Sequence, residues 1–179
     1  MNGTAYLKDV TQRFRDARKQ CDRALAQVPF ERWSYRLDPE SNSIVTLMLH
    51  LSGNMLSRWT DFLTTDGEKP ERDRDAEFED PETVSQDALL ARWELGWKCL
   101  FDALGALTEP DLDRAVTIRG QSLGVVEALN RQLAHYAQHA GQLVFLAKHL
   151  TAGQWKTLSV PRHGSAAFNA AMAQKHSKP

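Results

Sequence analysis

The fold class is decided by residues 123–150, which read LGVVEALNRQLAHYAQHAGQLVFLAKHL in this chain of 179 residues. Apolar side chains recur there at steps of three and four, which is the periodicity of a helix that is buried along one face. The segment therefore predicts a long helix over about residues 122–150, with Ser122 as its N-terminal cap. Its expected core positions are Leu129, Leu133, Tyr136, Ala140, Leu143, Val144 and Ala147.

Three segments upstream have the same helical periodicity. They predict helices over about residues 4–28, 43–64 and 83–108. Four helices around one core, with no strand-rich half, predict an all-α fold in the form of a four-helix bundle. The length is that of one domain, so we expect a single domain over residues 1–179.

Turn-forming and small residues mark the ends and contacts of these helices. The second helix is expected to take its N-cap from Ser41 or Ser43, and the third from Thr83 or Ser85. Gly96 interrupts the apolar pattern of the third helix and leaves room there for the close approach of a neighbouring helix.

The connections between the helices differ in character. Residues 66–82, DGEKPERDRDAEFEDPE, have no apolar periodicity and predict a charged, solvated surface loop, with a partner-binding patch as the alternative. Residues 115–119 alternate in polarity, which predicts a short extended segment before the last long helix, turned by Gly120. The tail, residues 151–179, is expected to be irregular, with one short helix in residues 165–174 and fraying at its end.

Composition excludes several classes of protein. Twenty-two basic residues face twenty-three acidic ones, so the net charge of −1 offers no basic field for nucleic acid. No apolar run is long enough to cross a membrane, and the N-terminus lacks the order of a secretory signal, so we expect a cytoplasmic protein. Cys21 and Cys99 lie far apart inside helical patterns and are expected to be core residues rather than a redox pair.

Three of the six histidines are candidates for a site. His135 and His139 are spaced i and i+4 on the last long helix, which places both imidazoles on one face, about 6 Å apart at their roots. His50 lies midway along the second helix at the border of its apolar arc. Each has a plainer interpretation: a hydrogen-bonded, half-buried histidine for His50, and chance spacing on a solvated face for the pair. A buried pair of imidazoles, however, must be neutral or hold a metal, because two imidazolium ions repel.

Together, His50, His135 and His139 have the composition of a metal site. Three neutral imidazoles without a carboxylate suit zinc or nickel, with iron or copper as further candidates. Such a set leaves at least one coordination position for water or substrate, where a water or thiol would ionise near neutral pH. The HYAQH stretch lacks the glutamate of HExxH, so zinc-protease chemistry is not supported. The remaining histidines, His149, His163 and His176, are assigned no chemistry.

The histidine on the second helix and the HYAQHAGQ block on the last one resemble the DinB-like superfamily of bacterial helical metalloproteins. More narrowly, three stretches are similar to a small branch of that superfamily whose biochemistry is undefined. They are residues 50–79 (HLSGNMLSRWTDFLTTDGEKPERDRDAEFE), 128–150 (ALNRQLAHYAQHAGQLVFLAKHL) and 154–169 (QWKTLSVPRHGSAAFN).

The resemblance implies a fold, a site and a class of reaction. It implies a four-helix bundle, usually a homodimer, whose metal triad falls on His50, His135 and His139. Relatives of known biochemistry attach low-molecular-weight thiols to electrophiles, or use a thiol in isomerisation, with zinc or nickel present. No thiol-binding set stands out here. Arg58, Arg119 and Arg131 are candidates to receive a carboxylate, or are ordinary surface or interface arginines.

Three functional hypotheses follow from the sequence. The first is a metal-dependent enzyme, thiol-S-transferase-like or hydrolase-like, that acts on a small thiol or another small molecule. The second is a non-catalytic bundle that binds a metal or ligand, for example in a stress response. The third is a plain helical scaffold in which the histidines are only packed.

Overall fold

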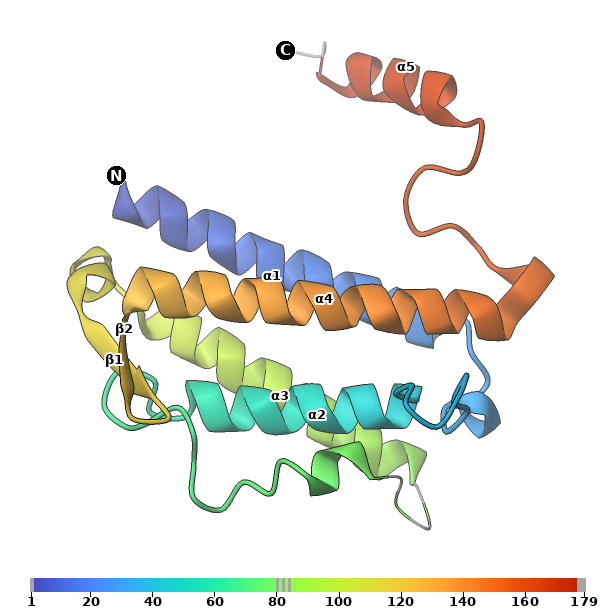
Figure 1. The fold of residues 1–179 in the computed structure, drawn as a ribbon. Coiled ribbons are helices and arrows are strands. Elements are labelled where there is room, and N and C mark those ends of the chain that lie inside the picture. The colour runs from blue at the N-terminus through green and yellow to red at the C-terminus, as the bar shows by residue number, and fades with distance from the viewer. Residues whose placement is uncertain (1, 80, 82, 84, 177–179) are drawn as a thin grey trace.

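The chain is mainly α-helical (Figure 1). A computed structural model describes residues 2–79, 81, 83 and 85–176. Four long helices and a shorter C-terminal one span these residues: α1 (Gly3–Leu25), α2 (Ile44–Trp59), α3 (Gln86–Ala106), α4 (Val125–Thr151) and α5 (Ser165–His176). A two-stranded antiparallel sheet, β1 (Ala115–Ile118) with β2 (Gln121–Gly124), precedes α4. No helix in the described part of the chain is long and apolar enough to span a membrane.

The N-termini of α2 and α3 confirm the serine caps expected from the sequence. The Ser43 hydroxyl accepts a hydrogen bond from the backbone N–H of Thr46 at 3.0 Å. The Ser85 hydroxyl accepts one from the backbone N–H of Ala88 at 3.4 Å. Each bond satisfies one of the backbone donors that the first turn of a helix leaves without an intrahelical partner. The N-cap of α2 is therefore Ser43 rather than Ser41, and that of α3 is Ser85 rather than Thr83.

Two of the expected helices end earlier than the sequence pattern suggests. α2 ends at Trp59 rather than near residue 64, because Thr60 is extended and Asp61 has a left-handed φ of 50°. Apolar Phe62 and Leu63 continue the periodic pattern past that break, which is why the pattern overshoots. α1 ends at Leu25, and the next residues form short turns instead of a further helical turn.

The extended segment before α4 is one strand of a hairpin. β1 confirms the strand expected there, and Gly120 turns the chain with a φ of 73°. Ser122, expected to cap the helix, instead lies in β2 opposite Thr117. Arg119 also has a positive φ, so both turn residues have the positive φ angles that a type I′ hairpin turn requires. α4 consequently begins at Val125, three residues after the expected cap.

The four long helices share one apolar core. α1 packs mainly against α4, and α2 packs mainly against α3 and also against α4. Gly96 confirms the close approach expected of it, since a Cβ atom there would lie 3.1 Å from the Cα of Ser52 on α2. Cys21 is buried in this core as expected, whereas Cys99 is only half-buried at its edge.

An aromatic cluster ties α2 to α4 next to the histidines. The Trp59 indole N–H donates to the hydroxyl of Tyr136 at 3.0 Å, and that hydroxyl donates to the side-chain oxygen of Asn54 at 2.9 Å. Phe14 of α1 packs edge-on against both rings. All of these side chains are buried, so the relative position of α2 and α4 is fixed where His50 and His135 face each other.

The tail beyond α4 contributes little to this core. Residues 155–164 contain no regular helix or strand, and α5 confirms the short helix expected in residues 165–174. Figure 1 shows α5 standing apart from the four long helices. The fraying expected at the end of the tail concerns residues 177–179, and the end of the charged loop includes Asp80 and Glu82; all of these lie outside the described residues.

Candidate metal centre

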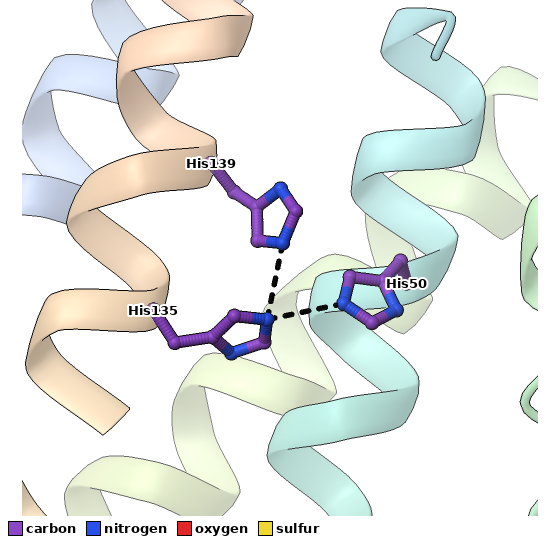
Figure 2. Close-up of side chains that lie close together, drawn as sticks. All are labelled: His50, His135 and His139. Carbon is purple, nitrogen blue, oxygen red and sulfur yellow. Dashed lines mark hydrogen bonds between the residues drawn. The ribbon is translucent and has the colours of Figure 1, made fainter. Parts of the chain in front are cut away.

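Three imidazole rings from α2 and α4 converge on one point, as Figure 2 shows. The Nε2 atom of His135 lies 3.2 Å from that of His50 and 3.0 Å from that of His139. One ring nitrogen from each of the three side chains lies within 4.8 Å of the others. The expectation that two distant stretches bring these rings together is confirmed, and the arrangement is compatible with a metal site.

The spacing of these nitrogens matches the edge of a coordination polyhedron. Imidazole nitrogens bound at 2.0–2.1 Å to a tetrahedral ion lie roughly 3.3 Å from one another. The observed separations of 3.0 and 3.2 Å are close to that value. Small side-chain rotations would therefore bring all three nitrogens within reach of one ion.

Hydrogen bonds to the Nδ1 atoms of His50 and His139 leave the Nε2 atom of each ring available to a metal. The Nδ1 of His50 lies 2.9 Å from a carboxylate oxygen of Glu77, and the Nδ1 of His139 lies 2.7 Å from the amide oxygen of Gln142. Both partner atoms are acceptors, so in the neutral form of each ring the proton is on Nδ1 and the lone pair is on Nε2. Two of the three Nε2 atoms thus face His135 as acceptors. An N–H group on His135 can donate to only one of these two acceptors, whereas a metal cation can bind the Nε2 atoms of all three histidines.

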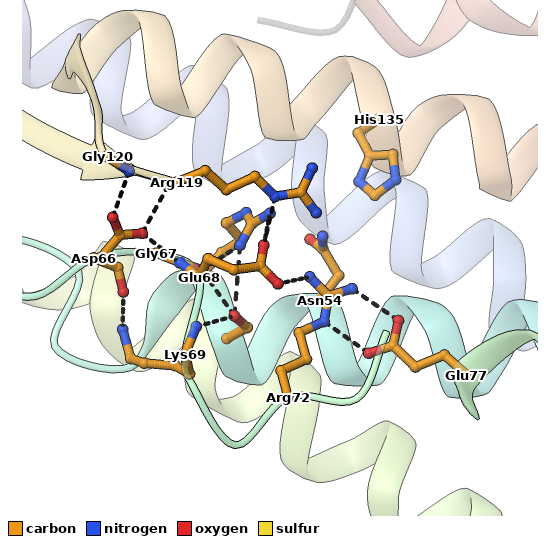
Figure 3. A network of polar contacts seen from close by, with 12 residues as sticks. Asn54, Asp66, Gly67, Glu68, Lys69, Arg72, Glu77, Arg119, Gly120 and His135 are labelled. Carbon is orange, nitrogen blue, oxygen red and sulfur yellow. Dashed lines mark hydrogen bonds and ion pairs between the residues drawn. The ribbon is translucent and has the colours of Figure 1, made fainter. Parts of the chain in front are cut away.

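Arg72 completes the support of His50. Its Nε and one terminal nitrogen each donate to Glu77 at 2.8 Å, and Figure 3 shows this paired contact. Although burial raises the pKa of Glu77, the hydrogen bonds from Arg72 and His50 outweigh it and hold that pKa below its ordinary value. Glu77 is therefore a carboxylate at neutral pH, and it orients His50 in the way that a carboxylate orients a metal-bound histidine.

Burial, with some contribution from neighbouring charges, keeps His135 and His139 neutral. Burial, with help from His139, His50 and nearby arginines, lowers the pKa of His135 to about 3. Burial also lowers the pKa of His139, against an opposing hydrogen bond from Gln142. Neutral imidazole is the form that binds a metal, so these two rings are ready to coordinate at pH values where a free histidine is partly protonated.

The triad opens into a cavity of about 400 Å³. Its wall contains the three histidines with Asn54, Phe78 and Gln132, and also a group of five arginines: Arg58, Arg72, Arg74, Arg119 and Arg131. The sequence had singled out three of these arginines as candidates to receive a carboxylate, and the structure brings all three to this wall.

The charged segment that begins at residue 66 is not simply a solvated loop. Glu77 is 5% exposed, and the side chain of Arg72 is equally buried. The Phe78 ring, which follows them, lies 4.6 Å from the His50 ring. Burial is tolerated because the carboxylate and the guanidinium satisfy each other. The sequence pattern did not reveal these buried residues, because the segment has no apolar periodicity. Phe78, an aromatic residue within a charged run, was the only sign that part of the segment is buried.

The other described histidines lie away from the triad. His149 is in the last turn of α4, where its ring stacks on Tyr35 at 5.9 Å. His163 lies in the irregular tail with a φ of 65°. Neither belongs to a group of described residues that could hold a metal. The side chain of His176 lies outside the described residues.

Comparison with known proteins places the chain in one family. No curated protein and no solved structure matches it. A family described as protein of unknown function, DUF1572, matches residues 1–164, which include all four long helices and all three histidines of the site. The chain therefore belongs to the DUF1572 family.

Proposed function

We propose that this chain is a metal-dependent enzyme of the DinB-like type, a four-helix bundle whose divalent ion is held by His50, His135 and His139. The observation that carries the proposal is the convergence of three Nε2 atoms, two of which keep free lone pairs because their Nδ1 atoms donate elsewhere. Packed histidines need no such convergence. Neutral rings aimed at one point are the expected form of a site that a cation completes.

Zinc or nickel is the proposed ion, with iron as the next candidate. An all-imidazole donor set suits borderline divalent transition metals, whereas magnesium and calcium prefer oxygen ligands. Three protein ligands also leave positions open to solvent or substrate, as catalytic sites do. An ion in such a site acts as a Lewis acid that ionises a thiol or water near neutral pH.

The side chains around the triad have separate roles in this proposal. Glu77 and Arg72 hold His50 in one orientation, and Gln142 does the same for His139. The Phe78 ring covers His50 and limits the access of water from that side. None of these residues touches the proposed substrate in this account, so they are positioning residues rather than catalytic ones.

The proposed reaction is the transfer of a low-molecular-weight thiol to an electrophile, with hydrolysis as the second reaction class. Metal-loaded protein incubated with bacillithiol, mycothiol or glutathione and monochlorobimane should form the fluorescent conjugate faster than the His139→Ala variant does. His149→Ala, which removes a histidine outside the triad, is the matched control and should retain full activity.

The outcomes of this assay separate the hypotheses. Equal rates for wild type and His139→Ala across all three thiols would overturn the transferase proposal. An ester-hydrolysis panel then tests the second reaction class. Bound metal and a higher Tm without turnover in either panel would identify a non-catalytic metal-binding protein. A homodimer is also proposed, and the molar mass in light scattering after gel filtration tests it.

A further inference from the structure

The wall of the triad cavity is built from arginines that come from separate parts of the chain. Arg58 comes from α2, Arg72 and Arg74 from the segment after it, Arg119 from the hairpin turn and Arg131 from α4. No aspartate or glutamate is among the described residues that line this cavity. The cavity is therefore positively charged on several sides at once, even though the whole chain has a net charge of −1.

Two carboxylates behind the wall neutralise only part of this charge. Glu68 accepts from Arg58 at 2.8 Å and from Arg119 at 2.9 Å, and Glu77 is paired with Arg72. The contact of Arg74 with Asp75 is long, at 3.8 Å, and exposed to solvent, so it is weak. Five arginines thus line the cavity, with one buried carboxylate (Glu77) and one partly exposed carboxylate (Glu68) beside them.

Polar atoms in this wall lack partners. The Nε of Arg58 and the side-chain oxygen of Gln132 are buried without a hydrogen bond, in residues that are 6% and 4% exposed. A buried polar atom without a partner is costly, so these two atoms point to a missing ligand or ordered water. An amide can present either its oxygen or its NH₂ group, so Gln132 is able to donate into the cavity.

Two arginines of this wall are exposed enough for a ligand to reach them. Arg131 makes no hydrogen bond or ion pair within the described part of the chain, and its side chain is exposed. Arg119 is about half exposed, and Figure 3 shows its guanidinium reaching past Glu68 toward His135. A planar guanidinium binds carboxylate and phosphate groups through paired hydrogen bonds, which suits both side chains to an anion.

We propose that this cavity binds a small organic molecule with at least two negative charges, a dicarboxylate or a phosphate ester, through Arg119 and Arg131. The volume of about 400 Å³ lies at the small end of the range of sites for small molecules. One anionic group lies between Arg119 and Arg131, and the rest of the molecule extends toward the histidines. The inference rests on the proposed function only for the ion that completes the site, because the arginines are present without it.

Isothermal titration in a low-salt buffer tests this inference. Succinate and glycerol 3-phosphate are the two anionic probes, and succinamide and glycerol are their neutral counterparts. At least one anion should bind, and its neutral counterpart should not. Arg131→Gln and Arg119→Gln should each weaken that binding by roughly tenfold or more, as expected for the loss of a charge-assisted contact. Arg162→Gln, which removes an exposed arginine of the tail, should leave the affinity unchanged.

The result assigns the ligand class and separates this inference from the proposed function. Binding of succinate alone identifies a carboxylate ligand, and binding of glycerol 3-phosphate alone identifies a phosphate ester. Failure of folded wild-type protein to bind either anion, or equal binding by Arg131→Gln, overturns the inference. Metal content is measured on the same samples. Metal retained after loading with zinc or nickel, without anion binding, refutes only this inference; anion binding without retained zinc or nickel refutes only the metal proposal.

Discussion

At the residue scale, His50 depends on partners that are neither ligands nor close to it in sequence. Its Nδ1 is 2.9 Å from Glu77, twenty-seven residues away, and Arg72 holds that carboxylate in turn. Outer-shell contacts of this kind set the orientation and basicity of a ligand without touching the ion. The affinity for metal is therefore expected to depend on Glu77 as well as on the three histidines.

Glu77→Gln should lower the affinity for zinc by about 10–100-fold, the usual effect of changing an outer-shell partner of a histidine ligand. The amide still accepts from His50, but it no longer carries the charge that strengthens this contact and balances Arg72. Competition with a chromophoric chelator measures the change. Glu79→Gln, at an exposed neighbouring position, is the control. Equal affinities for the two variants would exclude a role for Glu77 in the site.

His135 gives the metal-free protein a pH dependence with a definite sign. The folded state holds its pKa at about 3, against an ordinary value of 6.5, chiefly because the ring is buried. Between these values the unfolded chain binds more protons than the folded one, so the free energy of unfolding falls as the pH falls below about 6.5. Above that range His135 is neutral in both states and contributes no slope.

His135→Asn should flatten this dependence. Chelator-treated wild type and variant are unfolded with urea at several values between neutral pH and about pH 4, and the slope of unfolding free energy against pH should be smaller for the variant. The carboxylates titrate alike in both proteins, so the difference between the slopes reports His135. Parallel slopes would show that His135 is protonated as readily in the folded state as in the unfolded chain.

At the element scale, the segment after α2 is seated against that helix at Gly53. A Cβ atom at this position would lie 2.8 Å from the carboxylate carbon of Glu77, closer than side chains tolerate. The glycine therefore lets the carboxylate approach the helix backbone beside His50. This contact couples a loop position to the orientation of a ligand, although Gly53 bears no chemical group of its own.

Gly53→Ala should weaken zinc binding by about tenfold or more, because it displaces Glu77 from His50. Gly141→Ala is the control, since a Cβ atom there meets nothing within 4 Å. That control should raise the free energy of unfolding by up to about 1 kcal/mol through helix propensity alone and leave zinc affinity unchanged. Similar zinc affinities for both variants would contradict the proposed seating of the segment.

The parts of the site that lie on helices could be predicted from the sequence, whereas the parts that lie on the segment after α2 could not. Helical periodicity predicts the four long helices, and the i, i+4 spacing of His135 and His139 predicts their shared face. Glu77 and Arg72 could not be predicted in this way, because their burial depends on each other and on His50 rather than on an apolar pattern. The second strand of the hairpin was missed for a similar reason, since only one residue of Gln121–Gly124 is buried.

At the scale of the whole molecule, the site lies among α2, α4, the hairpin and the segment after α2, and α5 stands apart from the four long helices (Figure 1). The family match ends at residue 164, which is also where the irregular tail gives way to α5. Side chains of this helix are mostly exposed, including Phe168 at 45%. Burial of apolar surface is the main source of stability, so α5 is expected to add little to the fold.

Deletion of residues 165–179 should leave both Tm and zinc affinity unchanged. Differential scanning calorimetry and the chelator competition assay measure the two quantities on the same preparation. The reason is that no residue of the triad or of its outer shell lies in the deleted part. A clear fall in Tm would show that α5 packs against the helices in solution, either within one chain or across a dimer.

Metal content tests the central claim most directly, namely that His50, His135 and His139 share one ion. Untagged protein is loaded with zinc or nickel, passed through gel filtration and subjected to elemental analysis beside His139→Ala and His149→Ala. The account predicts about one ion per chain in wild type and in His149→Ala, and almost none in His139→Ala. No retained metal in wild type, or the same content in His139→Ala, would contradict it.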